Sequence, residues 1–167
     1  MTHDRIAPEE VQYSDTIRLL DPNGRVFFYQ GRVYRGIRPE RVAFVARLFD
    51  EGIVERLVAR GLLIGTRRTD LSLEGYGLVL EHDKLDVHIQ PREWSWPSYA
   101  NAATTYIELT KELCRHGLTF VDGHNLTVQS RRSPREDLAF RNCEVVPISS
   151  CGQAGGGLDG ESGDAGV

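Results

Sequence analysis

Arg25-Val-Phe-Phe-Tyr29 and Arg32-Val-Tyr-Arg-Gly36 are two runs of β-branched and aromatic residues, separated only by Gln30-Gly31. Runs of this composition favour β-strands. A two-residue connection that contains Gly, which tolerates a positive φ, is typical of a β-hairpin. The stretch therefore predicts an antiparallel hairpin over residues 25–36, which can serve as the centre of a small sheet.

Further helix and strand signals follow this hairpin. Pro39 stands at a first-turn position before apolar residues at helical spacing, and Gly52 and Gly61 are placed as stops. Two short helices are therefore expected between residues 39 and 61. Beyond them, apolar composition or apolar–polar alternation predicts three strands, at residues 62–64, 76–81 and 85–89.

The segment from Pro97 to about Arg115 carries the strongest periodic signal. Its apolar residues map onto one broad helical face, and Gly117 follows as a stop signal. At about 1.5 Å per residue, such a helix is roughly 30 Å long and forms the spine of the domain. Apolar residues at 118–121 and at Val128 then bracket a polar loop. Together these elements predict an α+β fold, with a small antiparallel sheet, short helices and one long helix.

The composition limits the classes of protein to consider. The chain has 167 residues, 40% of them hydrophobic, and a formal net charge of −4. These values suit one modest domain and supply no net field to concentrate nucleic acid. The apolar runs are far shorter than the ~20 residues that cross a bilayer, and residues 1–5 are polar. We therefore expect a cytoplasmic protein without nucleic-acid or membrane partners.

Cysteine and histidine spacing gives no indication of a metal site. Cys114, Cys143 and Cys151 are odd in number and lack Cys-x-x-Cys spacing, which disfavours a disulfide framework and a zinc site. His82 and His88 lie six apart on candidate strands, and no pair of histidines has the four-residue spacing of a helical metal clasp. Structural or surface roles are expected for the histidines, and no metal is expected.

The chain divides into four parts by composition. Seven of the 19 residues from 149 to 167 are Gly and none is Lys or Arg, so this segment buries too little apolar surface to offset its ordering entropy. We expect a flexible N-terminus over residues 1–14, an α+β domain over 15–130, an irregular segment over 131–148 and a disordered tail over 149–167.

Asp122 is the candidate catalytic residue. It follows the long helix and a short apolar stretch, as does the Asp that accepts a hydroxyl proton in phosphotransferase catalytic loops. In those loops an Asn five positions later holds Mg²⁺, whereas this chain has Thr127, a poorer ligand for a hard cation. A turn or capping role for Asp122 remains open beside that of a catalytic base.

Two tryptophans mark the start of the long helix. Trp94 and Trp96 lie beside Pro97 and could form an aromatic anchor for a protein partner. Tryptophans in such a position also pack into cores. The sequence leaves both interpretations open.

Six short segments, in their order and spacing, resemble one known family region. They are Asp21-Pro-Asn-Gly-Arg-Val-Phe27, Gly31-Arg-Val-Tyr-Arg-Gly-Ile37, Gly61-Leu-Leu-Ile64, Gly75-Tyr-Gly-Leu-Val-Leu-Glu-His82, Glu93-Trp-Ser95 and His116-Gly-Leu-Thr-Phe-Val-Asp122. Together they are similar to the N-terminal, protein-kinase-like region ahead of the methyltransferase domain in a group of bacterial class I S-adenosylmethionine-dependent methyltransferases. The resemblance spans roughly residues 15–130.

This resemblance implies a partial protein-kinase-like fold, in which Asp122 matches the family's first Asp and Thr127 stands where Asn is usual. After Gln129 the chain departs from the family pattern, without the expected hairpin, second Asp or methyltransferase domain. We therefore expect an auxiliary or inactive pseudo-enzyme fragment, truncated or frameshifted, of a methyltransferase-related protein. No cofactor is expected unless a missing C-terminal domain supplies an S-adenosylmethionine site. Alternatives are a phosphotransferase-like nucleotide-binding protein that uses Asp122 and a protein-interaction module.

Overall fold

The computed structural model describes residues 4–14, 23–84 and 94–120, together with the backbone of three short strands at 128–130, 138–140 and 145–147. The expected strand at 85–89, Asp122, Thr127 and the tail from 149 onward lie outside the described residues.

The hairpin lies at the centre of the sheet. Strands β3 (Gly24–Tyr29) and β4 (Arg32–Ile37) pair antiparallel along their whole length. Gln30 and Gly31 form the turn with φ of 47° and 74°. Positive φ at both central residues is the geometry whose twist matches that of the flanking strands. The hairpin prediction is confirmed.

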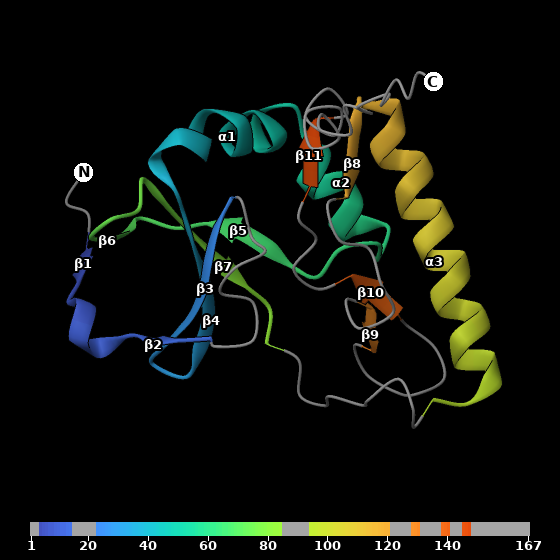
Figure 1. The fold of residues 1–167 in the computed structure, drawn as a ribbon, viewed down its shortest axis with the longest axis horizontal. Coiled ribbons are helices and arrows are strands. Elements are labelled where there is room, and N and C mark those ends of the chain that lie inside the picture. Colours follow the sequence, from blue (N-terminus) through green and yellow to red (C-terminus); the bar gives the residue numbers. More distant parts are fainter. Residues whose placement is uncertain are drawn as a thin grey trace, which may run out of the picture.

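Three further strands extend the hairpin into an antiparallel sheet in the order β2-β3-β4-β7-β5 (Figure 1). β2 (Gln12–Tyr13) pairs with β3, whereas β7 (Leu78–His82) pairs with β4 on the other side. β5 (Thr66–Arg68) pairs with the far edge of β7. The described chain is therefore a mixed α and β protein with a five-stranded antiparallel sheet at its centre.

Both faces of this sheet are covered, which explains why β4 and β7 lack a solvent-facing row of polar residues. On one face, Phe27, Tyr34 and Val79 form a buried cluster with Ile6 and Leu73. On the other face, Ile37 and Leu80 pack against Val45 of the first α-helix. Alternate residues of a strand point to opposite faces, so each central strand contributes to two separate cores.

Two short helices cover the second face, as the sequence predicts. A 3-10 turn, Pro39–Arg41, leads into α1 (Val42–Asp50), and α2 (Ile53–Ala59) follows directly. Gly52 separates them with a φ of 66°, and Gly61 ends α2 with a φ of 70°. Both positions require the left-handed conformation that glycine adopts without strain.

The strand expected at residues 62–64 is wrong. The backbone N–H groups of Leu62 and Leu63 instead donate to the carbonyl oxygen of Leu57 and cap α2. Leu62 is apolar because it packs into the core beneath the helix. The strand of this region is β5, which begins only at Thr66 and carries polar residues.

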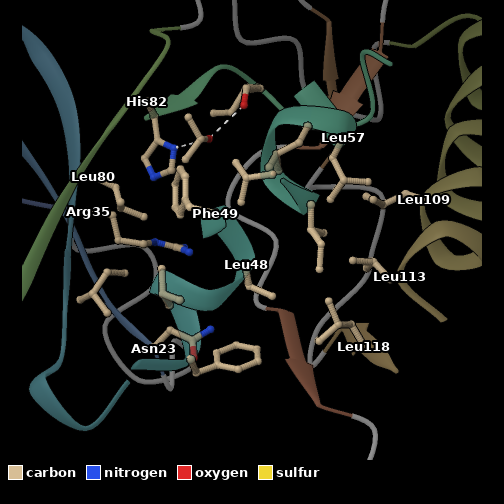
Figure 2. Close-up of a pocket in the computed structure, with 18 residues that line it drawn as sticks. Asn23, Arg35, Leu48, Phe49, Leu57, Leu80, His82, Leu109, Leu113 and Leu118 are labelled. Carbon is tan, nitrogen blue, oxygen red and sulfur yellow. Dashed lines mark hydrogen bonds between the residues drawn. The ribbon is translucent and has the colours of Figure 1, made fainter. Parts of the chain in front are cut away.

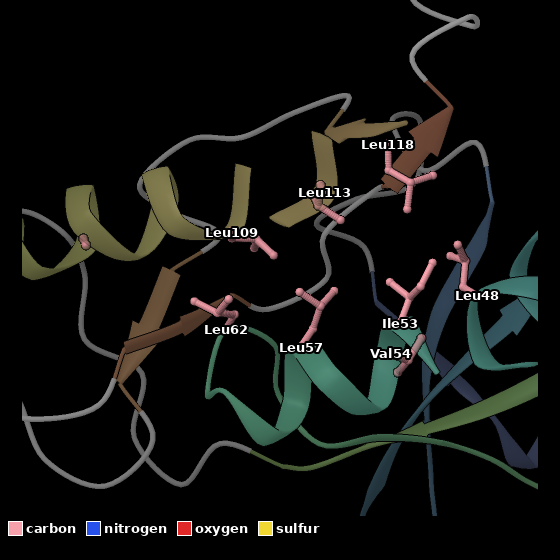
Figure 3. Packing of buried hydrophobic residues seen from close by; sticks show 9 residues of the cluster. Leu48, Ile53, Val54, Leu57, Leu62, Leu109, Leu113 and Leu118 are labelled. Carbon is pink, nitrogen blue, oxygen red and sulfur yellow. The ribbon is translucent and has the colours of Figure 1, made fainter. Parts of the chain in front are cut away.

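The long helix is α3 (Trp96–Arg115), of 20 residues. The Ser95 hydroxyl oxygen accepts a hydrogen bond from the backbone N–H of Ser98, and Gly117 follows the helix with a φ of 67°. β8 (Leu118–Phe120) comes next. Side chains of α2, α3 and β8 form the largest core cluster, which includes Leu57, Leu109, Leu113 and Leu118 (Figure 3).

Residues 4–14, which belong to the segment 1–14 that the sequence analysis expected to be flexible, form two strands and a 3-10 turn. β1 (Asp4–Ile6) pairs in parallel with β6 (Leu71–Leu73), and a 3-10 turn (Pro8–Glu10) connects it to β2. Ile6 is only 1% exposed, because it packs against Phe27 and Leu73. The N-terminal segment therefore covers the first face of the sheet.

The segment after residue 130 is less irregular than expected. β9 (Val128–Ser130) and β10 (Leu138–Phe140) pair antiparallel, and β11 (Val145–Pro147) pairs antiparallel with β8. The sequence analysis expected residues 131–148 to be irregular and the hairpin after Gln129 to be absent. In the structure, β9 and β10 pair with each other on either side of residues 131–137.

In the parts of the chain that the structure describes, no helix combines the length and the apolar composition needed to cross a bilayer.

Candidate functional site

A pocket of about 80 Å³ lies between the second face of the sheet and helices α1, α2 and α3 (Figure 2). Eighteen described residues line it, and most of them are aliphatic or aromatic. The polar members of this lining are Asn23, Arg35, Thr66 and His82. An apolar lining with a few polar groups is also the composition of small-molecule sites.

Strand geometry brings the polar groups of the pocket together. Arg35 of β4 pairs in register with Leu80 of β7, and His82 of β7 pairs with Thr66 of β5. Residues two apart on a strand share a face, so His82 lies on the same face as Leu80. The polar end of the pocket therefore extends across three neighbouring strands.

A chain of hydrogen bonds fixes the tautomer of His82. The Thr66 hydroxyl donates to the carbonyl oxygen of Ile64 at 2.9 Å, and the same Oγ1 atom lies 3.0 Å from His82 Nδ1. A hydroxyl has only one hydrogen, so Nδ1 must carry the hydrogen of the second bond. This tautomer leaves a lone pair on Nε2, which is buried and has no hydrogen-bond partner among the described residues.

The surroundings of His82 keep its ring neutral. The side chain is 7% exposed. Burial lowers its pKa from 6.5 to about 3, and the positive charges of Arg35 and Arg67 act in the same direction. His82 Nε2 is therefore a hydrogen-bond acceptor at every pH at which the protein would normally function.

The opposite end of the pocket is apolar. Figure 2 shows His82 and Arg35 on the sheet side, whereas Leu109, Leu113 and Leu118 come from α3 and β8 on the other side. The pocket thus has one end with an acceptor and a buried cation and one end lined by leucines.

Charged residues on the first face of the sheet form a separate network. Glu81 is paired with Arg67 at 2.7 Å and with Arg32 at 3.2 Å, and Arg67 also reaches Asp83 at 3.1 Å. Side chains at 81 and 82 leave opposite faces of β7. None of the side chains in this network therefore lines the pocket.

The residues that the sequence singled out lie elsewhere. Asp122 and Thr127 are outside the described residues. Trp94 packs against the core, with its ring 5.3 Å from that of Tyr99, whereas Trp96 is 83% exposed. A single exposed aromatic ring is common on protein surfaces and does not by itself define an interface.

Arg35 and His82 are the pocket residues that sequence reasoning missed. Both are polar residues at positions of a strand that should face a core, since Arg35 lies two residues from Ile37 and His82 two from Leu80. A polar residue in an otherwise apolar row of a strand was therefore the sequence signal that could have identified these two residues. Within the described residues, no group of three or more His, Cys, Asp or Glu side chains could hold a metal ion.

Comparison with known proteins gives one distant similarity to report. No protein-family model matches the chain. Over 114 residues the chain is 28% identical to "Nodulation protein NoeA" of Rhizobium meliloti (strain 1021), an alignment that covers 65% of this chain and 24% of NoeA. The two proteins are distantly similar. The chain spans about a quarter of the length of NoeA.

Proposed function

We propose that this chain is a non-catalytic, small-molecule-binding region of a methyltransferase-related protein. The order of motifs described above supports the relationship to methyltransferases, and the alignment with a quarter of NoeA is compatible with a region of a longer protein. The chemistry of the pocket supports a binding role.

The observation that carries this proposal is the set of groups that the pocket presents. Its described lining contains no carboxylate and no thiol. Thr66 is the one hydroxyl in that lining, and its hydrogen is donated to Ile64 O while its oxygen accepts from His82. His82, with a pKa of about 3, is too weak a base to activate a nucleophile near neutral pH. Such groups favour binding over catalysis.

The sheet also supports placing methyl transfer outside this region. A doubly wound nucleotide-binding site is built from parallel strands, with a glycine loop leading from a strand to a helix N-terminus. The five-stranded sheet described here is antiparallel throughout. An S-adenosylmethionine site would therefore belong to another domain of the complete protein.

A kinase-like small lobe is the fold proposed for this region, and phosphoryl transfer through Asp122 is the second candidate function. Kinases place a Lys on the third strand and pair it with a Glu of the next helix. Arg35 lies on the third strand of this sheet, which favours the comparison. The next helix contributes Phe44, Val45, Leu48 and Phe49 to the pocket instead of a carboxylate, which argues against nucleotide chemistry.

The test is calorimetric titration of the purified full chain with S-adenosylmethionine and, separately, with Mg·ATP. Neither should bind, and Mg·ATP should not be hydrolysed. Micromolar binding of S-adenosylmethionine at one site per chain would contradict the proposal. Hydrolysis of Mg·ATP that disappears in Asp122→Asn would replace it with the phosphotransferase candidate.

A further inference from the structure

We propose that the pocket takes a neutral aliphatic molecule with one hydrogen-bond donor, of which a short-chain alcohol is the simplest example. The donor binds His82 Nε2, and the aliphatic part extends towards Leu109 and Leu113. This inference rests on the binding role proposed above, and it adds the chemical class of the ligand.

The acceptor on His82 requires a donor from the ligand. Nε2 is buried, carries the lone pair of the ring and has no partner among the described residues. A buried polar atom without a partner costs free energy, which a ligand O–H or N–H group would recover. A molecule that offers only acceptors, such as an ether, would leave this atom as it is.

The positive charges around the pocket disfavour a cationic donor, and an anionic group such as a carboxylate has no hydrogen to donate. Arg35 lines the pocket and is 6% exposed, and its charge and that of Arg67 both act on the His82 ring. An ammonium group placed on Nε2 would meet this positive potential in a medium of low dielectric constant. A hydroxyl or amide N–H group supplies the donor without that repulsion.

The size and lining of the pocket select a small aliphatic body. The pocket volume of about 80 Å³ is several times larger than the volume that one water molecule needs, which is about 10–15 Å³. Waters at the leucine end would find few polar partners, because Leu109, Leu113 and Leu118 line it. A small aliphatic ligand therefore fits both the volume and the lining.

The experiment compares two isomers, 1-butanol and methyl propyl ether, which have the same atoms but differ in the hydroxyl hydrogen. The full chain is titrated with each, and binding is followed by NMR of the His82 ring nitrogens. The alcohol should bind at least tenfold more tightly than the ether and should shift the Nε2 resonance more than the Nδ1 resonance.

His82→Phe provides the matched variant. The Phe ring is similar in shape to the imidazole but has no acceptor nitrogen, and the Thr66 hydroxyl keeps its hydrogen bond to Ile64 O. In this variant the alcohol and the ether should bind with equal affinity. The Nε2 shift in the unmodified protein keeps the test decisive if the variant fails to fold.

The outcomes separate the two proposals. Binding of both isomers with equal affinity, or movement of resonances without a shift at Nε2, overturns the ligand class and leaves the binding role intact. Absence of binding by either isomer at millimolar concentration overturns the ligand class together with the binding role. A preference for the alcohol that persists in His82→Phe overturns the assignment of His82.

Discussion

The hydrogen of the Thr66 hydroxyl determines whether His82 offers a hydrogen-bond donor or an acceptor to the pocket. Because Thr66 donates its hydrogen to Ile64 O, its oxygen can only accept from the imidazole, and the lone pair must lie on Nε2. Had Thr66 donated to the ring instead, Nε2 would carry a hydrogen and the pocket would present a donor. The backbone conformation at Ile64 thus decides which ligands the ring can bind.

The same burial makes His82 a source of acid sensitivity. Its pKa is about 3 in the folded protein against an ordinary value of 6.5, because of burial and the charges of Arg35 and Arg67. Between these values the unfolded chain binds a proton that the folded chain excludes. The free energy of unfolding should therefore fall as the pH is lowered from 6.5 towards 3, and His82→Asn should lose part of this dependence.

Urea denaturation at pH 7 and pH 4.5 measures the effect. The loss of stability between the two pH values should be larger, by more than 1 kcal/mol as a rough expectation, in the unmodified protein than in His82→Asn. Carboxylates contribute equally to both proteins, so the difference isolates His82. Equal losses would show that the ring is solvated or paired in the folded state.

At the scale of elements, helices α2 and α3 are joined by both apolar packing and a carboxylate. Glu112 of α3 accepts hydrogen bonds at 2.6 Å from Arg60, which follows α2, and from Arg115. Burial tends to raise the pKa of Glu112, but the hydrogen bonds from Arg115 and Arg60 outweigh it and lower the pKa. Charged hydrogen bonds at the rim therefore orient the helices over the leucine core.

The two faces of α3 should respond differently to the loss of side-chain volume. Leu113 is 1% exposed in the core shared with α2 and β8, whereas Ile107 on the same helix is 50% exposed. Leu113→Ala should lower the free energy of unfolding by about 2–5 kcal/mol, through lost burial and the cavity left behind. Ile107→Ala is the matched control and should cost less than about 1 kcal/mol. Similar costs for both variants would mean that α3 does not pack as described.

Sequence patterns correctly predicted the elements that are specified by residues close to one another in the chain. The β3–β4 hairpin, α1, α2 and α3 follow from turn residues, glycine stops and helical periodicity, all of which act over a few residues. The edge strand β5 was missed because Thr66-Arg-Arg68 is polar, and Leu62-Leu-Ile64 was mistaken for a strand because its apolar residues serve the core of the neighbouring helices.

The remaining features depend on contacts between residues distant in sequence. β1 pairs with β6, so that Asp4 lies beside Leu71, and no local pattern specifies such a parallel pairing. Arg35 and His82 meet at the pocket only because β4 and β7 are neighbours in the sheet. The mixed α and β class with an antiparallel sheet was therefore accessible from sequence, whereas the candidate site required the strand order.

At the scale of the whole molecule, the sheet separates two cores that depend on different parts of the chain. Helices α1, α2 and α3 cover the face that contains the pocket, whereas Ile6 and Leu73 cover the face that contains Phe27. The N-terminal segment thus has a structural role on the side away from the pocket. Its removal should affect stability without changing the groups that line the site.

Deletion of residues 1–7 tests this division. It removes Ile6, which is 1% exposed, and uncovers Phe27, which is 0% exposed. The free energy of unfolding should fall by at least the about 1.5–3 kcal/mol associated with burial of one large aliphatic side chain, and the thermal midpoint should fall with it. Deletion of the glycine-rich residues 149–167 is the control, because their composition predicts no packed core and hence an unchanged midpoint. A midpoint that is unaffected by the first deletion but lowered by the second would reverse the assignment, and would place the stabilising terminus at the C-terminal end.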